Sequence, residues 1–154
     1  MLKTQILECD RRIMAWHRSN AASKRLDAIP GVGPALATAL VASVADPRAF
    51  RSGRDFSAWV GLVPKQRSSG GKDKLGSISK RGDRYLRSLF TAGALAVIRY
   101  AKIHGTRHGP WLTALLARRP TKVAAIALAN KLARMAWAMM AKGEHYKEPA
   151  ALAA

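Results

Sequence analysis

Residues 83–102, DRYLRSLFTAGALAVIRYAK, indicate the fold class because their apolar side chains recur with the period of an α-helix. Side chains with that spacing share one face of a helix, and such a face has to be buried against other elements. The sequence therefore predicts a long helix from about Asp83 to Lys102. Its predicted buried side consists of Leu86, Leu89, Phe90, Ala94, Val97 and Ile98.

Three further segments carry helical patterns. Residues 50–62 predict a short helix that ends at Pro64 and takes Phe56, Trp59 and Val60 to the core. Trp111 to Arg118 and Thr121 to Lys142 predict two more helices, separated by Pro120. The predicted packing residues of the last helix are Val123, Ile126, Leu128, Leu132, Trp137 and Met140, with Lys122, Lys131 and Arg134 on its outer face. We expect a mainly α fold, with only a weak signal for a small hairpin through Lys72 to Ile78.

The first twenty residues have a different pattern, with apolar side chains at alternating steps of four and three. These positions are Leu2, Ile6, Cys9, Ile13 and Trp16, and they match the a and d positions of about two heptads. A helix this short is marginal alone, so it is either the stub of a longer coiled coil or an arm on its own domain. We favour a stub at 1–20 that supports homo-oligomers in a full-length form, then a helical domain at 21–143 and a disordered tail at 144–154.

Residues 26–42, LDAIPGVGPALATALVA, predict a helix, a tight turn from Gly31 to Gly33 and a second helix begun by Pro34. The pattern resembles the helix-hairpin-helix motif and places it near 26–44. In that motif, backbone N–H groups of the turn and of the following helix bind a DNA phosphate without reading bases. Gly31 and Gly33 are therefore candidate nucleic-acid-binding residues. A plain packing corner between two helices is the alternative.

The charge of the chain favours a polyanionic partner. Its 154 residues carry 27 Lys and Arg against 9 Asp and Glu, a formal net charge of +18, and the pI is about 11.3. A hydrophobic content of 49% suffices for a buried core, so the chain is not a disordered tail. Nucleic acid is the leading partner, although ribosomal proteins and membrane-surface peptides share such a charge.

The sequence gives no sign of a membrane span, a signal peptide or a metal site. Its longest apolar runs, such as Val123 to Ala129, are far shorter than the roughly 20 residues that cross a bilayer. We expect no membrane partner and a cytoplasmic, nucleoid-associated protein. The single Cys9 forms no internal disulfide. His104 and His108 lie four apart, but the glycines that follow each of them argue against a metal pair on one continuous helix.

Residues 61–72, GLVPKQRSSGGK, place two hydroxyls beside glycines and cations, which is an arrangement suited to holding a phosphate. Gly70 and Gly71 let the backbone come close to a ligand. Ser68 and Ser69 then become candidate nucleophiles, and a solvated surface turn is the alternative. The basic residues that can neutralise an approaching phosphodiester are Lys65, Arg67, Lys72 and Lys74.

Residues 79–87, SKRGDRYLR, add a second basic cluster that includes Lys80. Arg81, Arg84 and Arg87 lie three apart at the start of the predicted long helix, so we expect them to share one exposed face and to line a phosphate path. The helix dipole disfavours cations in the first turn unless an anion arrives. An ordinary solvated face is the alternative.

The order of these features resembles the C-terminal domain of the insertion-sequence transposases that join a RuvC-like DEDD domain to this module, the bridge-RNA-guided recombinases. The resemblance covers about Leu2 to Pro149. Its most specific parts are Gly61 to Lys72 and Ser79 to Arg87. The features in question are the stub, the helix-hairpin-helix, AWVGLVP at 58–64, SSGGK at 68–72, ISKRGDRYLR at 78–87 and WAMM at 137–140.

The resemblance implies DNA transposition and site-specific recombination through a serine. In that family a serine of the C-terminal domain attacks the scissile phosphodiester and holds the DNA covalently. Carried onto this sequence, the nucleophile falls on Ser68, with Ser69 left open. The RuvC-like domain or subunit supplies four acidic residues that bind Mg²⁺, and a bridge RNA chooses the target. The implied partners are DNA, a bridge RNA and that acidic domain, and this chain itself binds no cofactor.

The acidic residues of this chain depart from the family pattern, because no strand-borne cluster of carboxylates is present. They are Glu8, Asp10, Asp27, Asp46, Asp55, Asp73, Asp83, Glu144 and Glu148. The acidic domain is therefore expected to be lost by truncation, omitted by an internal start or supplied by another polypeptide. We expect the chain alone to bind DNA or structured RNA without exchanging strands. The alternatives are a non-catalytic binding module, an inactive transposase remnant and a small basic ribosomal or nucleoid protein.

Overall fold

The computed structural model of the chain is mainly helical, as the sequence predicted. It describes residues 1–69, 72–79, 81–105 and 108–148, and for 65–69 and 72–76 it describes the backbone only. Gly70, Gly71, Lys80 and most of the predicted tail lie outside the described residues. The elements are α1 (Leu2–Ser19), α2 (Ala21–Leu26), α3 (Pro34–Ser43), the 3₁₀ turn η1 (Pro47–Ala49), α4 (Gly53–Val60), β1 (Pro64–Ser69), β2 (Lys72–Ile78), α5 (Arg84–His104), α6 (Gly109–Arg118) and α7 (Thr121–Lys142).

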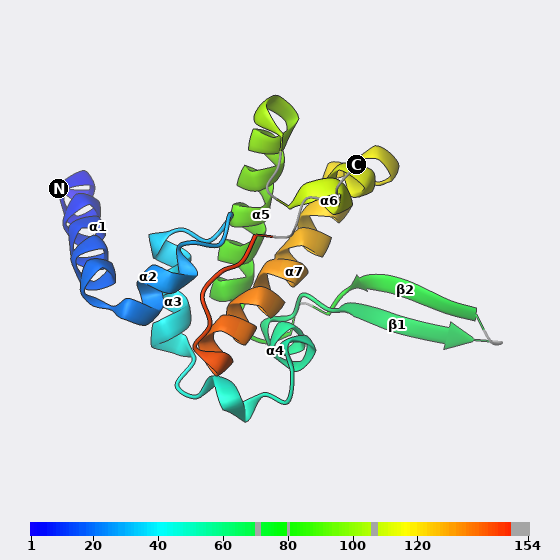
Figure 1. Ribbon diagram of the computed structural model, residues 1–154, viewed down its shortest axis with the longest axis horizontal. Coiled ribbons are helices and arrows are strands. Elements are labelled where there is room, and N and C mark those ends of the chain that lie inside the picture. Colours follow the sequence, from blue (N-terminus) through cyan, green and yellow to red (C-terminus); the bar gives the residue numbers. More distant parts are fainter. Residues whose placement is uncertain (70–71, 80, 106–107, 149–154) are drawn as a thin grey trace.

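The two long helices α5 and α7 pack against each other at the centre of the molecule, and the other helices surround this pair (Figure 1). The long helix predicted from Asp83 to Lys102 is confirmed as α5. Asp83 is its N-cap, and a carboxylate oxygen of Asp83 accepts the Leu86 N–H at 3.0 Å. The helix ends before Gly105, whose φ of 81° lies in the region that favours glycine.

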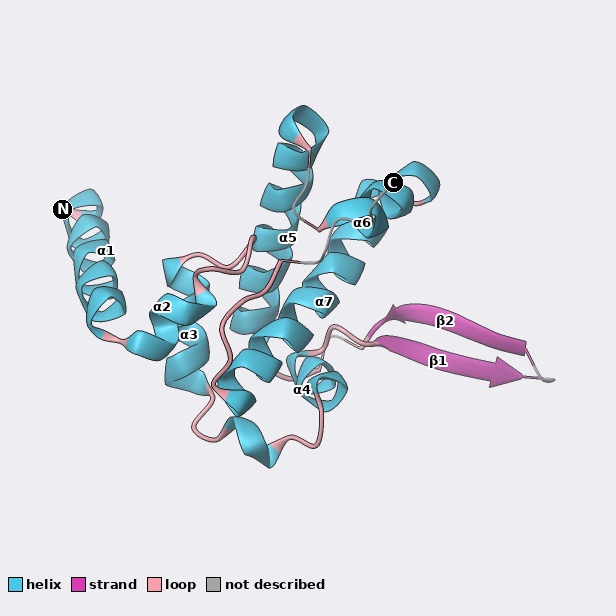
Figure 2. Cartoon of the chain, viewed as in Figure 1, coloured by secondary structure: helices cyan, strands magenta, loops and turns pink. Residues whose placement is uncertain are grey.

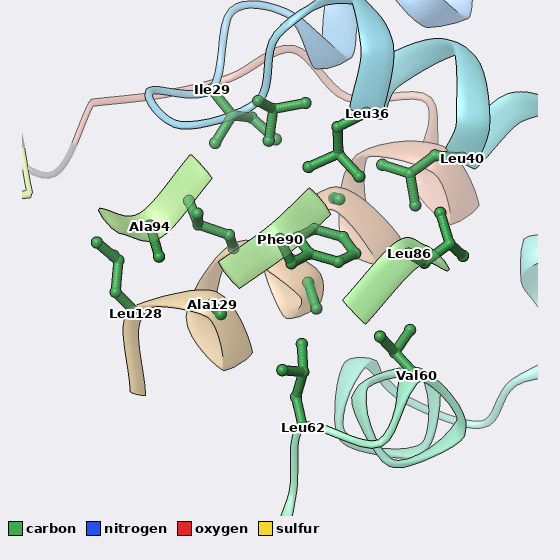
Figure 3. Close-up of a cluster of buried hydrophobic side chains, with 14 of the residues drawn as sticks. Ile29, Leu36, Leu40, Val60, Leu62, Leu86, Phe90, Ala94, Leu128 and Ala129 are labelled. Carbon is green, nitrogen blue, oxygen red and sulfur yellow. The ribbon is translucent and has the colours of Figure 1, made fainter. Parts of the chain in front are cut away.

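The core lies between these two helices and is completed by α3, α4 and the turn before α3. Phe90 and Leu86 of α5 are buried among Leu36 and Leu40 of α3 and Val60 of α4 (Figure 3). The small buried side chains of α7 allow α5 to approach it closely. These side chains are Ala124, Ala125, Ala129, Ala133 and Ala136.

The predicted packing face of α7 needs correction. Leu128 and Leu132 are buried as predicted, but Val123 is 51% exposed. Ile126, Trp137 and Met140 are only partly buried, because the alanines take the central positions. By length and composition α7 could cross a membrane, a test that the core helix of a soluble protein also passes.

Helix α4 carries Phe56 and Val60 into the core, but the predicted position of Trp59 is wrong. Trp59 is 38% exposed and lies beside Phe50 and Phe56 at ring-centroid separations of 5.4 and 5.9 Å. The helix also ends at Val60 rather than at Pro64, which begins β1. Gly61 is the C-cap of this helix, and its φ of 91° lies in the left-handed region that favours glycine.

Helix α1 leaves the body of the molecule as a separate arm (Figure 2). Its heptad residues Leu2, Ile6 and Trp16 are exposed. Its last turn is held by the buried His17, whose Nδ1 lies 2.7 Å from the Ser23 hydroxyl and whose Nε2 lies 3.4 Å from an Asp27 carboxylate oxygen. The helix is therefore anchored to the body of the molecule at its C-terminal end.

The turn between α2 and α3 meets α5 through two glycines. Gly31 has φ 99°, and its carbonyl oxygen lies only 2.0 Å from where a side-chain carbon of Gly93 would be. Any residue larger than glycine at position 93 must push the turn away from α5. Gly93 therefore fixes the distance between the turn and the central helix.

We predict that Gly93→Ala lowers the free energy of unfolding by about 1–3 kcal/mol, because the added methyl group overlaps the Gly31 carbonyl. Helix propensity alone predicts the opposite sign, a gain of about 0.5–1 kcal/mol. Urea unfolding followed by circular dichroism distinguishes the two. A more stable variant would contradict the close contact.

Candidate nucleic-acid interface

The segment with the two serines forms an antiparallel pair of strands that extends away from the helices (Figure 2). Ser68 pairs with Asp73 and Ser69 with Lys72, at the end of the pair far from the helical body. A register shift between Pro64 and Gln66 interrupts the regular pairing near the base. The serines are thus carried at the end of an arm.

The base of this arm is locked by two glycines in the left-handed region. A side-chain carbon on Gly82, at φ 97°, would lie 1.6 Å from the Trp59 carbonyl oxygen. One on Gly61 would lie 2.3 Å from the Arg81 carbonyl oxygen. The chain entering β1 and the chain leaving β2 are therefore in backbone contact where they join α4 and α5, which defines how the arm meets the helices.

The three arginines near the arm do not share one exposed helix face, so that prediction is wrong. Arg81 precedes α5 and is exposed, because the helix begins only at Arg84, which is also exposed. Arg87 is half-buried, and its Nη1 donates a hydrogen bond to the Val60 carbonyl at 3.3 Å. Arg81 and Arg84 are therefore available to an anion, whereas Arg87 satisfies a carbonyl at the C-terminus of α4.

The turn between α2 and α3 is longer than predicted, because α2 ends at Leu26 and α3 begins at Pro34. Four N–H groups of the turn donate to carbonyls within the chain, those of Asp27, Ala28, Ile29 and Val32. Within the described part of the chain, the N–H groups of Gly31, Gly33, Ala35 and Leu36 make no such bond. Gly33 is exposed, with open space around it. Donors for a phosphate are thus restricted to the end of the turn and the start of α3.

The arm and the turn both contact α5, but at different points along it. The arm joins at Gly82, just before the helix begins, and the turn packs at Gly93. From Arg84, the first residue of α5, to Gly93 the helix rises by about 14 Å. The structure therefore separates the two predicted phosphate-binding elements along one helix instead of combining them in one pocket.

The histidines and acidic residues do not form a metal centre in the described part of the chain, where no three His, Cys, Asp or Glu side chains come together. His104 is exposed, whereas His108 is buried with its Nε2 3.3 Å from the Pro30 carbonyl. Burial lowers the pKa of His108 below its ordinary value of 6.5. His108 thus ties the start of α6 to the turn.

Helix α6 is also tied to α7, through a cation over an aromatic ring. The Lys131 ammonium lies 4.2 Å from the centre of the Trp111 ring, and burial lowers the pKa of Lys131. Lys131 was predicted on the outer face of α7, but it is partly buried. Its contact with Trp111 explains that position.

Two exposed aromatic residues of α5 were missed by the sequence interpretation. Tyr85 is 60% exposed and Tyr100 is 63% exposed. Both lie off the apolar stripe, so a helical projection of 83–102 could have placed them on the solvent side.

Comparison with known proteins places the chain in a family. The model of the Transposase IS116/IS110/IS902 family matches residues 23–108, which include the turn, the arm and α5. The chain is 48% identical over 146 residues to a probable family 20 transposase of Pseudomonas aeruginosa, covering 95% of this chain and 43% of that protein. It is 47% identical over 148 residues to the putative transposase y4pF/y4sB of Sinorhizobium fredii, covering 96% of this chain and 38% of that protein.

A third relative gives the same result. The transposase for insertion sequence element IS1111A of Coxiella burnetii is 41% identical over 138 residues, which cover 90% of this chain and 38% of that protein. The chain thus spans about two fifths of the length of these curated relatives. The fold, the site and these similarities lead to one conclusion: the chain belongs to the Transposase IS116/IS110/IS902 family.

Proposed function

We propose that this chain is the serine-bearing, DNA-binding part of an insertion-sequence transposase, and that a serine of the β1–β2 arm attacks a DNA phosphodiester. One observation carries the proposal: in a transposase family, the arm holds two adjacent serines at its far end, away from the helical body. A net charge of +18 supports binding to a polyanion.

The proposed step exchanges one P–O bond for another. The serine oxygen forms a bond to phosphorus, the bond from phosphorus to a nucleoside oxygen breaks, and the DNA stays attached as a phosphoserine. A base removes the serine proton, and a donor protonates the departing oxygen. Cations stabilise the charge on the pentavalent phosphorus. We assign this part to Lys65, Arg67, Lys72, Arg81 and Arg84, with Lys80, Gly70 and Gly71 among the proposed nucleic-acid contacts outside the described residues.

The register gives the two serines different neighbours. Ser69 pairs with Lys72, a cation that favours a bound phosphate, whereas Ser68 pairs with Asp73, a carboxylate that could take its proton. Each serine therefore has one feature of an activated nucleophile. The variant Asp73→Asn distinguishes the two candidate nucleophiles, because it slows the reaction strongly only if Ser68 attacks with Asp73 as its base.

Mg²⁺ fits this proposal only when it is supplied by another domain. In the described part of the chain no set of three acidic or imidazole side chains could bind it. We propose that a RuvC-like domain or subunit holds the ion beside the serine, where it would activate the nucleophile and stabilise the leaving oxygen. A bridge RNA would choose the target in the cytoplasm, near the nucleoid.

The turn before α3 and the exposed stripe of α1 have roles in the same proposal. The N–H groups of Gly31 and Gly33, which bond to no backbone carbonyl of the described residues, support a contact with a DNA phosphate that reads no base. The exposed heptad residues Leu2, Ile6 and Trp16 support association of copies in a full-length protein. The chain would then contact DNA both at the arm, near the start of α5, and at the turn, near the middle of α5.

A non-catalytic binding module is the second candidate, favoured by the lack of clustered carboxylates in the described residues. It retains the cations and gives the serines no chemistry. The two candidates differ in whether loss of a serine hydroxyl abolishes covalent attachment to DNA.

We predict that, with this domain joined to an acidic Mg²⁺-binding domain, loss of the nucleophilic hydroxyl abolishes covalent trapping of nicked DNA. Ser68→Ala and Ser69→Ala are compared by denaturing gel electrophoresis, and DNA affinity is measured in parallel. One variant should lose at least about a thousandfold in trapping, the scale seen when a nucleophile is removed, while affinity stays within about twofold. If both variants trap DNA normally, the enzyme proposal is wrong.

We predict that Arg84→Ala mainly weakens DNA binding, whereas Arg87→Ala mainly lowers stability. Exposed Arg84 should contribute to phosphate binding, so its loss weakens duplex binding and lowers the slope of log affinity against log salt by about 1. Arg87 satisfies the Val60 carbonyl, so its loss should lower the free energy of unfolding by about 1–3 kcal/mol. Fluorescence anisotropy and thermal unfolding measure the two. Equal effects on affinity and none on stability would show that Arg87 is a phosphate ligand instead.

A further inference from the structure

A cleft of about 680 Å³ lies between the turn before α3 and the C-terminal half of α5, away from the arm. Its lining from the turn includes Asp27, Pro30 and Gly31, and its lining from α5 includes Val97, Tyr100 and His104. A volume of this size is typical of small-ligand sites, which reach roughly 300–1,000 Å³. The proposed phosphodiester chemistry of the arm does not use it.

The α5 wall of the cleft presents two neighbouring rings. Tyr100 and His104 are four residues apart and therefore stand on one face of the helix. Their ring centroids are 4.7 Å apart with planes inclined by 39°. Tyr100 is 63% exposed and His104 is exposed as well, so the pair has ring surface that the protein does not cover. Such a surface can stack on a planar aromatic ligand.

The charge around the cleft favours a ligand that carries phosphates. Arg99, next to Tyr100 in the sequence, is an exposed cation, whereas the Lys102 ammonium donates a hydrogen bond to the Thr121 hydroxyl of α7 at 3.1 Å. The opposite wall holds one anion, Asp27, whose side chain is 42% exposed and has one oxygen 3.4 Å from His17 Nε2. A planar ligand that donates a hydrogen bond and is attached to an anionic backbone matches the Arg99 cation, the two rings and the Asp27 carboxylate.

We propose that this cleft binds an unpaired base of a single-stranded nucleic acid. The base stacks on Tyr100, its amino group donates to the Asp27 carboxylate, and a flanking phosphate lies near Arg99. The inference rests on the proposed nucleic-acid-binding function and extends it from phosphate contacts to bases. A paired base in a duplex cannot occupy the site, because its faces are covered by neighbouring bases.

The chemistry also predicts which bases fit. Cytosine, adenine and guanine carry an amino group that can donate to Asp27, whereas thymine has none. Stacking on an aromatic ring depends little on which base is present, so the preference among bases comes from the Asp27 carboxylate. Oligo(dC) should therefore bind more tightly than oligo(dT) of the same length.

The test measures binding of the intact chain to fluorescent single-stranded dC12, to dT12 and to a duplex by anisotropy. Tyr100→Ala should weaken binding to dC12 about tenfold, the scale of one lost stacking contact, without changing duplex affinity or the melting temperature. Tyr100→Phe should restore most of the affinity because it keeps the ring. The matched control is Tyr85→Ala, which removes an equally exposed ring of the same helix outside the cleft.

Asp27→Asn should reduce the preference for dC12 over dT12. The inference is overturned if Tyr100→Ala binds dC12 as tightly as the unchanged chain, or if Tyr85→Ala weakens it equally. Duplex binding that persists in those cases leaves the proposed function standing. If the unchanged chain binds neither duplex nor single strands, the proposed function fails as well.

Discussion

The structure depends on close backbone contacts that only glycine permits, all of them on or beside α5. The Gly31 carbonyl lies against Gly93, and the Trp59 carbonyl lies against Gly82. The Arg81 carbonyl lies against Gly61. The first contact sets the turn against the middle of α5, and the other two set the serine arm at its beginning. The two elements that carry the proposed chemistry are thereby held at separate positions along one helix, which is itself fixed by α7.

This arrangement keeps the backbone of the arm outside the core of a small, highly basic chain. The core between α5 and α7 provides stability, with alanines on α7 allowing the close approach. Cations in the first turn of α5 oppose the helix dipole, which is a cost that a bound phosphate would remove.

The sequence predicted the parts of the fold that follow from local pattern. The period of residues 83–102 and the stop at Pro120 gave the bounds of α5 and α7 almost to the residue. The pattern could not reveal that alanines replace Val123 and Trp137 at the centre, because helix packing depends on the distance between axes. It also could not show that Arg87 bonds to Val60, 27 residues earlier in the chain. The cleft beside Tyr100 likewise arises only when the turn packs on α5.

The central claim is that a serine of the arm becomes covalently joined to DNA, and mass spectrometry of the trapped complex tests it most directly. DNA is trapped with the domain joined to its acidic partner, the nucleic acid is digested, and the protein is cut into peptides. The account predicts a nucleotide attached to the peptide that contains residues 68 and 69. Cleaved DNA with no attached peptide, or with a nucleotide on any other residue, would contradict it.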